Sequence, residues 1–266
     1  MAYFGKEGSH MSVEVKNLTF SYGQHKVLNN TGLIANDGEL LAVLGANGSG
    51  KSTLFNCMLG LLKPSSGQVL IDGVPIREMS AMELARRVAY VPQSHSPSFS
   101  YSVFDMVLMG TTPQVRGAGV PGRREALQTD GALEMLGIAD LRSRAYTEIS
   151  GGERQLTLIA RAIAQQARVL ITDEPTANLD YGNSLRILKK IKELAREGYT
   201  VIQSTHNPDH AFLFADRVAA LSDGHIIADG EPAATITPEL VTHLYGVRVT
   251  VEAAANGSRT CVPAMQ

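Results

Sequence analysis

The sequence predicts an α/β protein built on a largely parallel β-sheet, because short apolar runs alternate with stretches of helical periodicity. Four of these runs have the character of buried strands, and each leads directly into polar residues. Since open sheets of this class bind ligands at the carboxyl ends of their strands, the four junctions mark the expected site. The runs cover residues 40–44, 88–91, 169–172 and 201–205.

Other segments complete the expected organisation. Residues 218–221 and 226–228 flank the turn Ser222-Asp223-Gly224, which predicts a hairpin. Residues from about 94 to 167 contain helical stretches and predict an α-helical subdomain inserted into the sheet. Within it, the Gly/Pro/Arg-rich segment 114–124 predicts a mobile surface loop. Near the N-terminus, alternating apolar residues predict further β-structure: Val13, Val15, Leu18, Phe20 and the run 69–71.

Composition limits the classes of function. The chain has 266 residues, 44% of them hydrophobic, and a formal net charge of -2. This length supports one well-packed domain with an inserted subdomain, and the near-neutral charge argues against a nucleic-acid partner. No stretch approaches the roughly 18 apolar residues of a membrane-spanning helix, so a membrane role is expected to need another chain. The distant Cys57 and Cys261 predict neither a disulfide nor a zinc framework and favour a reducing, cytosolic setting.

The two ends of the chain are expected to lie outside the main domain, which is predicted over residues 11–252. Gly8-Ser9-His10 before Met11 resembles a cloning scar, so residues 1–10 are interpreted as a tag or a disordered N-terminus. The small, polar residues 253–266 predict a flexible tail.

A glycine-rich loop directly follows the strand predicted at 40–44. It fits the phosphate-loop pattern G-x-x-x-x-G-K-[ST] and leads into a predicted helix. In this context, backbone N–H groups and the helix N-terminus favour phosphate charge, Lys51 reaches the β- and γ-phosphates, and the Ser52 hydroxyl binds Mg²⁺. The expected nucleotide-binding residues here are Gly45, Ala46, Asn47, Gly48, Ser49, Gly50, Lys51, Ser52 and Thr53.

Two carboxylates end the strand predicted at 169–172. Asp173 is expected to hold the hydration shell of Mg²⁺, and Glu174 to direct the water that attacks the γ-phosphate. Phosphoryl transfer depends on positioning, charge neutralisation and an oriented nucleophile, which these residues can supply. Taken alone, the pair could equally be a solvated acidic turn that caps the next helix. The phosphate loop favours the catalytic interpretation.

Residues 149–155, Ile-Ser-Gly-Gly-Glu-Arg-Gln, resemble the signature motif of ATP-binding-cassette (ABC) proteins. With the two motifs above, they make the chain similar to that superfamily from residue 11 to about residue 246. Further family motifs follow at the expected spacing: an aromatic loop at Tyr22, a Q-loop at Gln93, a D-loop at 177–180 and a switch histidine at His206. The resemblance implies a P-loop NTPase (RecA-like) core, an N-terminal antiparallel β subdomain and the inserted helical subdomain.

The resemblance also implies a role for each motif. ATP is the substrate and Mg²⁺ the cofactor, and a second copy of the chain pairs head to tail with the first. The catalytic residues are Lys51, Gln93, Glu174 and His206, and the metal site comprises Ser52, Gln93 and Asp173. Tyr22 stacks on adenine, whereas Ser150, Gly151, Gly152 and Glu153 contact the nucleotide of the opposite subunit near the D-loop residues Asn178 and Asp180. A rival interpretation pairs His206 with His210 as zinc ligands at helical spacing.

One branch of the family is favoured. Residues 99–110 resemble the segment that receives a coupling helix from the permease in importers of metal chelates, and residues 206–211 resemble the same branch. This implies the ATPase subunit of an importer of an iron–siderophore, haem, cobalamin or molybdate, bound peripherally at the cytoplasmic face of the membrane. Its implied partners are two permease subunits and, indirectly, a substrate-binding protein. Phe104 and Met109 are predicted as exposed contacts to the permease, or else as packing residues of the helical insert.

Three other functions remain possible at this point: the ATPase of an exporter, a non-transport ABC ATPase, and a small-molecule kinase. The sequence contains neither the long coiled-coil interruption typical of repair ATPases nor a second cassette, and the signature and D-loop motifs argue against a kinase.

Overall fold

A six-stranded sheet forms the centre of the computed structural model, which describes residues 12–93, 100–115, 119–255 and 257–264. Its strands are β3 (Leu40–Leu44), β6 (Val88–Val91), β7 (Val169–Thr172), β8 (Thr200–Thr205), β9 (Arg217–Ser222) and β10 (His225–Gly230). They lie in the order β10-β9-β3-β8-β7-β6. The strands from β9 to β6 run parallel, and β10 pairs antiparallel with β9 at the edge. The structure thus confirms the predicted parallel sheet and the predicted hairpin, which is formed by β9 and β10.

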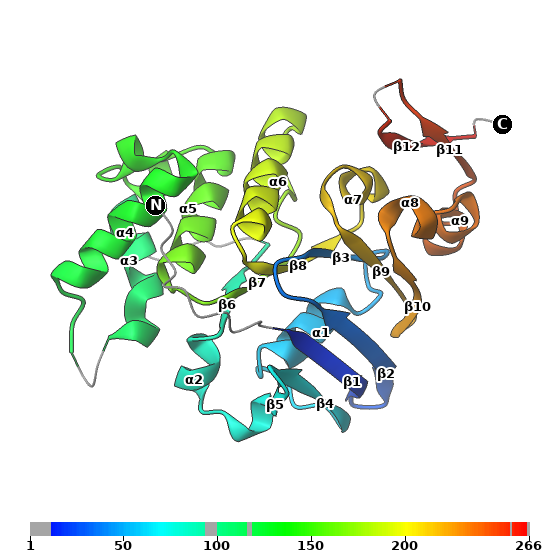
Figure 1. Cartoon of the computed structure of the whole chain (residues 1–266), viewed down its shortest axis with the longest axis horizontal. Helices are drawn as coiled ribbons and strands as arrows, with labels where there is room; N and C mark the ends of the chain where they lie inside the picture. Colours follow the sequence, from blue (N-terminus) through cyan, green and yellow to red (C-terminus); the bar gives the residue numbers. More distant parts are fainter. Residues whose placement is uncertain (1–11, 94–99, 116–118, 256, 265–266) are drawn as a thin grey trace.

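A second, antiparallel sheet has four strands in the order β2-β1-β4-β5, where these are β1 (Val13–Tyr22), β2 (His25–Ala35), β4 (Ser66–Ile71) and β5 (Val74–Pro75). The helix α1 (Lys51–Met58) lies between the two sheets (Figure 1). Its buried Leu54, Phe55 and Met58 share one apolar cluster with strands of both sheets. Because α1 begins at the end of the phosphate loop, this packing holds the loop in place.

The helices of the predicted insert lie between β6 and β7 in the chain and beside the sheet in space (Figure 1). They are α3 (Val103–Leu108), α4 (Arg123–Leu136) and α5 (Gly151–Ala164), with the 3₁₀ turns η2 (Met109–Gln114), η3 (Ala139–Leu141) and η4 (Tyr146–Glu148). The short η1 (Ile76–Glu78) and α2 (Ala81–Ala85) precede β6. The predicted loop 114–124 is too long, since Arg123 and Arg124 already belong to α4; its residues 116–118 lie outside the described part.

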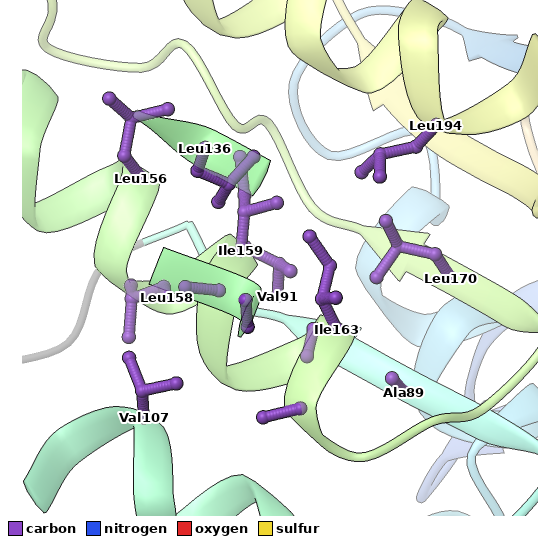
Figure 2. Close-up of a cluster of buried hydrophobic side chains, with 14 of the residues drawn as sticks. Ala89, Val91, Val107, Leu136, Leu156, Leu158, Ile159, Ile163, Leu170 and Leu194 are labelled. Carbon is purple, nitrogen blue, oxygen red and sulfur yellow. The ribbon is translucent and has the colours of Figure 1, made fainter. Parts of the chain in front are cut away.

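One apolar cluster joins the helical insert to the sheet. Leu156, Ile159 and Ile163 lie along the buried side of α5, as its 3.6-residue period predicts. They pack against Val91 and Leu170 of the sheet, with Leu194 of α6 (Tyr181–Arg196) nearby (Figure 2). The N-terminus of α5 is therefore held at a defined position relative to the strand ends.

The C-terminal region covers one end of the sheet with α7 (Pro208–Phe214), α8 (Pro232–Thr235), α9 (Pro238–Tyr245), β11 (Val249–Ala253) and β12 (Arg259–Pro263). The prediction of a flexible tail is wrong for residues 259–263, because β12 pairs antiparallel with β11 and packs on α7. The Cys261 amide donates to Asp209 Oδ1 of α7 at 2.8 Å, a long-range contact that local composition does not reveal. The prediction for residues 1–10 falls outside the described part.

Within the residues that the structure describes, every helix is too short or too polar to cross a bilayer.

Candidate functional site

The predicted site residues of the sheet meet at one edge. The phosphate loop follows β3, Gln93 follows β6, Asp173 and Glu174 follow β7, and His206 follows β8. These four strands are neighbours in one parallel sheet, so their carboxyl ends adjoin. A cavity of ≈ 340 Å³ lies there, lined by Tyr22, Val27, Asn47, Gly48, Gly50, Lys51, Ser52, Thr53, Gln93 and Glu174.

The phosphate loop has the backbone features that an anion site needs. Gly50 precedes α1 with φ of 106°, a left-handed conformation that glycine adopts without strain. A Cβ atom at Gly45 would lie 2.5 Å from the Leu221 carbonyl oxygen, so this turn also requires glycine. Gly50 offers α1 no side-chain cap, so the first amides of the helix remain directed toward the cavity.

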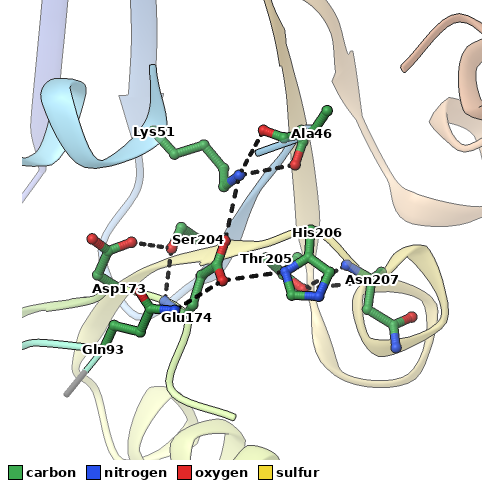
Figure 3. Close-up of polar contacts among 10 residues, drawn as sticks. Ala46, Lys51, Gln93, Asp173, Glu174, Ser204, Thr205, His206 and Asn207 are labelled. Atoms are coloured by element: carbon green, nitrogen blue, oxygen red, sulfur yellow. Dashed lines mark hydrogen bonds and ion pairs between the residues drawn. The ribbon is translucent and has the colours of Figure 1, made fainter. Parts of the chain in front are cut away.

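Lys51 is buried and fully engaged. Its Nζ donates to the carbonyl oxygens of Gly45 at 2.9 Å and Ala46 at 3.0 Å, and lies 3.5 Å from Glu174 Oε1 (Figure 3). An ammonium group has three N–H donors, and these contacts account for all three. Burial lowers the pKa of Lys51, while the nearby charges of Glu174 and Asp173 oppose that shift.

Glu174 lies at the centre of the polar cluster. Its Oε2 is 3.2 Å from His206 Nδ1 and accepts a long hydrogen bond of 3.5 Å from Gln93 Nε2 (Figure 3). With Lys51 on its other oxygen, the Glu174 carboxylate contacts the other three residues predicted to be catalytic. Glu174 also has φ of 43°, a left-handed conformation that is uncommon for residues other than glycine and is often found at functional sites.

Ser204 supports both acidic residues, although no sequence motif predicts it. Its Oγ donates to Asp173 Oδ1 at 2.6 Å and accepts from the Glu174 amide at 2.8 Å. Ser204 is fully buried on β8. Tyr90 of β6 contacts the same Asp173; burial and then the Asp173 charge raise the pKa of Tyr90 to about 12. The available signal for this role was a polar residue next to the end of a buried strand, although Gln203 and Thr205 beside it share that feature.

The signature and D-loop residues lie away from the cavity. Ser150 caps α5, and no residue from 150–153 or 177–180 belongs to the described lining of the cavity. The two motifs instead adjoin one another: a Cβ atom at Gly152 would lie 2.8 Å from Asn183 Oδ1, which explains the need for glycine there. Asp180 caps α6 by accepting the Asn183 amide at 2.8 Å. One chain therefore presents two separate groups of candidate residues: those that line the cavity, and those of the signature and D-loop motifs. In the D-loop, Asn178 has a left-handed backbone conformation, with φ of 63°.

Tyr22 stands at the rim of the cavity. The residue is 52% exposed, and its ring meets Phe20 edge-on, with the ring centroids 4.9 Å apart. The edge contact supports the tyrosine while leaving ring surface accessible, which is the geometry that stacking of a nucleobase requires.

The prediction that Phe104 and Met109 are exposed needs correction. Both residues are partly buried, and Phe104 packs against the core of the helical insert. The Arg142 guanidinium covers the ring, with its carbon 3.8 Å from the ring centroid. Phe99, at the start of the predicted docking segment, lies outside the described residues.

The structure offers no support for zinc at His206 and His210. In the part of the chain with described coordinates, no three His, Cys, Asp or Glu side chains gather as a metal site. His206 contacts Glu174 instead, and burial is the main cause of a lowered pKa at His210.

Comparison with known proteins decides the family. The family model described as ABC transporter matches residues 28–177. The chain belongs to the ABC transporter family. This ABC chain is an ATPase with the predicted P-loop fold, so the family, fold and activity predictions are confirmed.

Several relatives align with most of this ABC chain. An ABC transporter ATP-binding protein of Haemophilus influenzae, without an assigned function, is 40% identical over 88% of this chain and 89% of its own. The hemin import ATP-binding protein of Deinococcus radiodurans is 38% identical, over 91% and 93%. The cobalamin import ATP-binding protein of Halobacterium salinarum is 36% identical over 95% of this chain but 64% of its own length.

A solved structure described as an inward-facing, metal-chelate type ABC transporter matches this ABC chain with a TM-score of 0.85. It is 32% identical and covers 96% of this chain and 98% of its own. CbiO1 of Clostridium perfringens, part of the CbiONQ transporter complex, matches with a TM-score of 0.76 and 33% identity, covering 84% and 89%.

The position of Ser204 leads to a prediction. Ser204→Ala removes the hydroxyl that orients Asp173 and the Glu174 backbone, so kcat for ATP should fall by roughly 10- to 100-fold, as for other supporting residues of metal sites. The control is Thr172→Val on the adjacent β7, where the buried hydroxyl has no hydrogen-bond partner among the described atoms. Steady-state ATPase assays should find the control near wild type. A normal kcat for Ser204→Ala would contradict the assignment.

Proposed function

We propose that this chain is the ATP-hydrolysing subunit of an importer of a metal chelate, bound peripherally at the cytoplasmic face of the membrane. The observation that carries the ATPase mechanism is the Glu174 carboxylate, which contacts Lys51, Gln93 and His206 beside the phosphate loop. The printed names of the hemin, cobalamin and metal-chelate relatives support the class of cargo. Iron–siderophore, haem, cobalamin and molybdate are the candidates within that class.

ATP binding uses the cavity and its rim. Tyr22 stacks on adenine, and the loop from Gly45 to Thr53 holds the phosphates through its backbone amides and Lys51. The γ-phosphate takes the place that the Glu174 carboxylate now occupies between Lys51, Gln93 and His206. Both groups are anionic oxygen acceptors, so the same three donors serve either one.

The side-chain oxygen atoms at the cavity also suit Mg²⁺, which prefers oxygen ligands and keeps part of its water shell. Ser52 and Gln93 line the cavity, and the Asp173 carboxylate lies beside it with one oxygen held by Ser204. In this proposal, the Ser52 hydroxyl, the Gln93 amide oxygen and Asp173 hold the ion, the last through water. When bound, Mg²⁺ neutralises negative charge on the phosphates.

Hydrolysis requires Glu174 to leave its contacts with Lys51 and His206. The freed carboxylate orients a water molecule and accepts its proton as the water oxygen bonds to the γ-phosphorus and the bond to ADP breaks. His206 then contacts the γ-phosphate. The positive φ of Glu174 helps, because it turns the side chain from β7 toward the cavity.

A second copy of the chain completes the site. Ser150, Gly151 and Gly152 form the N-terminus of α5, an end that favours an anion, yet they lie away from their own cavity. Head-to-tail pairing brings this helix end to the γ-phosphate of the opposite chain, with Asn178 and Asp180 at the contact. The separation of the two residue groups within one chain supports this arrangement.

The membrane partners are two permease subunits, with a substrate-binding protein acting on their outer side. The permease contact lies at Gln93 and the segment 101–109, since Gln93 lines the cavity and leads toward α3. The partly buried Phe104, with Arg142 over its ring, is part of this surface. A change at the γ-phosphate is thereby passed to the permease.

The proposed role of Glu174 predicts that a substitution there impairs ATP hydrolysis but does not weaken ATP binding. Glu174→Gln should retain ATP binding while turnover falls on the order of 10²–10⁴-fold, because the amide cannot accept the proton of water. Single-turnover assays with ATP would measure the chemical step directly. Near-normal turnover would remove Glu174 from the mechanism.

The proposed cargo class predicts coupling in membranes. When the chain is co-purified with its permease and binding protein in lipid vesicles, a metal chelate presented to the binding protein should raise the ATPase rate. The control omits the chelate but keeps all protein components. If none of the four chelate classes raises the ATPase rate, although the complex hydrolyses ATP, the importer assignment is refuted and an exporter is favoured.

A further inference from the structure

The hydroxyl of Ser150 is already occupied within its own chain. Ser150 Oγ donates to Glu153 Oε2 at 2.7 Å, and the Ser150 amide donates to the same oxygen at 2.8 Å. In return the Glu153 amide donates to Ser150 Oγ at 3.4 Å, which completes a capping box. A serine hydroxyl has a single donor. It must therefore leave Glu153 before it can donate to a phosphate.

Glu153 also places a negative charge where an incoming phosphate would bind. A helix N-terminus stabilises an anion, and here the Glu153 carboxylate already supplies one in the first turn of α5. The hydrogen bonds from Ser150 lower the pKa of Glu153, and the charges of Arg144 and Arg186 act in the same direction. Glu153 is consequently ionised at neutral pH, and the triphosphate of a facing chain approaches a like charge.

We propose that the Glu153 carboxylate opposes closure of the ATP-bound dimer by holding the Ser150 hydroxyl and repelling the γ-phosphate. This inference rests on the proposed pairing in which Ser150 faces the nucleotide of a second copy. Glu153 is then a positioning residue that sets the ATP concentration at which two copies close. Glutamine at this position would keep a capping oxygen for Ser150 but remove the charge.

The chain contains a matched control on α2. Ser80 and Glu83 form the same box: Ser80 Oγ donates to Glu83 Oε2 at 2.8 Å, the Ser80 amide at 2.7 Å, and the Glu83 amide returns a bond of 3.2 Å. Neither residue lines the described cavity. Glu83→Gln thus reproduces the change in helix capping without a change at the phosphate site.

The test measures ATP-dependent dimer formation by sedimentation velocity in the Glu174→Gln background, where hydrolysis is slow. Adding Glu153→Gln should lower the ATP concentration for half-maximal dimer on the order of tenfold, as expected for removing a like charge about 4 Å away where solvent keeps the effective dielectric constant nearer 80 than 20. The gain should shrink between about 50 mM and about 500 mM salt, because screening weakens it. Glu83→Gln should produce no shift.

An additional Ser150→Arg variant in the same background tests the proposed head-to-tail pairing separately from the role of Glu153. If Ser150→Arg still forms the ATP-dependent dimer, the proposed pairing fails. If Ser150→Arg blocks the dimer but Glu153→Gln leaves the half-maximal ATP concentration unchanged or raises it, only the role of Glu153 fails. A shift of the same size with Glu83→Gln, or one independent of salt, would assign the effect to helix capping and overturn the inference.

Discussion

Contacts of the Glu174 carboxylate with Lys51 and His206 hold the candidate site together. They join the ends of three neighbouring strands: Lys51 follows β3, Glu174 follows β7 and His206 follows β8. The buried Lys51 ammonium also donates to two carbonyl oxygens, but the Glu174 carboxylate is the anion in direct contact with it, and removing that anion from a poorly solvated site is costly. In the proposed mechanism, the γ-phosphate replaces Glu174 at Lys51 when ATP binds.

Packing of the two sheets and of the helical insert holds the site residues at defined positions. Packing of α1 between the sheets fixes the phosphate loop, and the apolar cluster around Ile159 fixes α5 against β6 and β7. Ser204 then orients both acids from the intervening strand β8.

Much of this arrangement could be predicted from the sequence. Residues 40–44 form a strand because five consecutive buried apolar residues suit a two-sided sheet, and the phosphate loop follows from the strand, glycines and helix in succession. Three features depended on contacts between distant residues and were missed. Ser204 acts through Asp173, β12 is held by Asp209, and Phe104 is covered by Arg142. None of these partners is a neighbour in the sequence.

Binding of nucleotides to Glu174→Gln tests the exchange of anions most directly. Titration calorimetry would compare a non-hydrolysable ATP analogue with ADP, for the wild-type chain and for the variant. The variant should bind the triphosphate at least about tenfold more tightly, because it loses a charged hydrogen-bond acceptor that competes with the γ-phosphate. Its affinity for ADP should rise less, since Lys51 alone of the three donors is expected to reach the β-phosphate. An unchanged affinity for the triphosphate, or an equal gain for both nucleotides, would contradict the account.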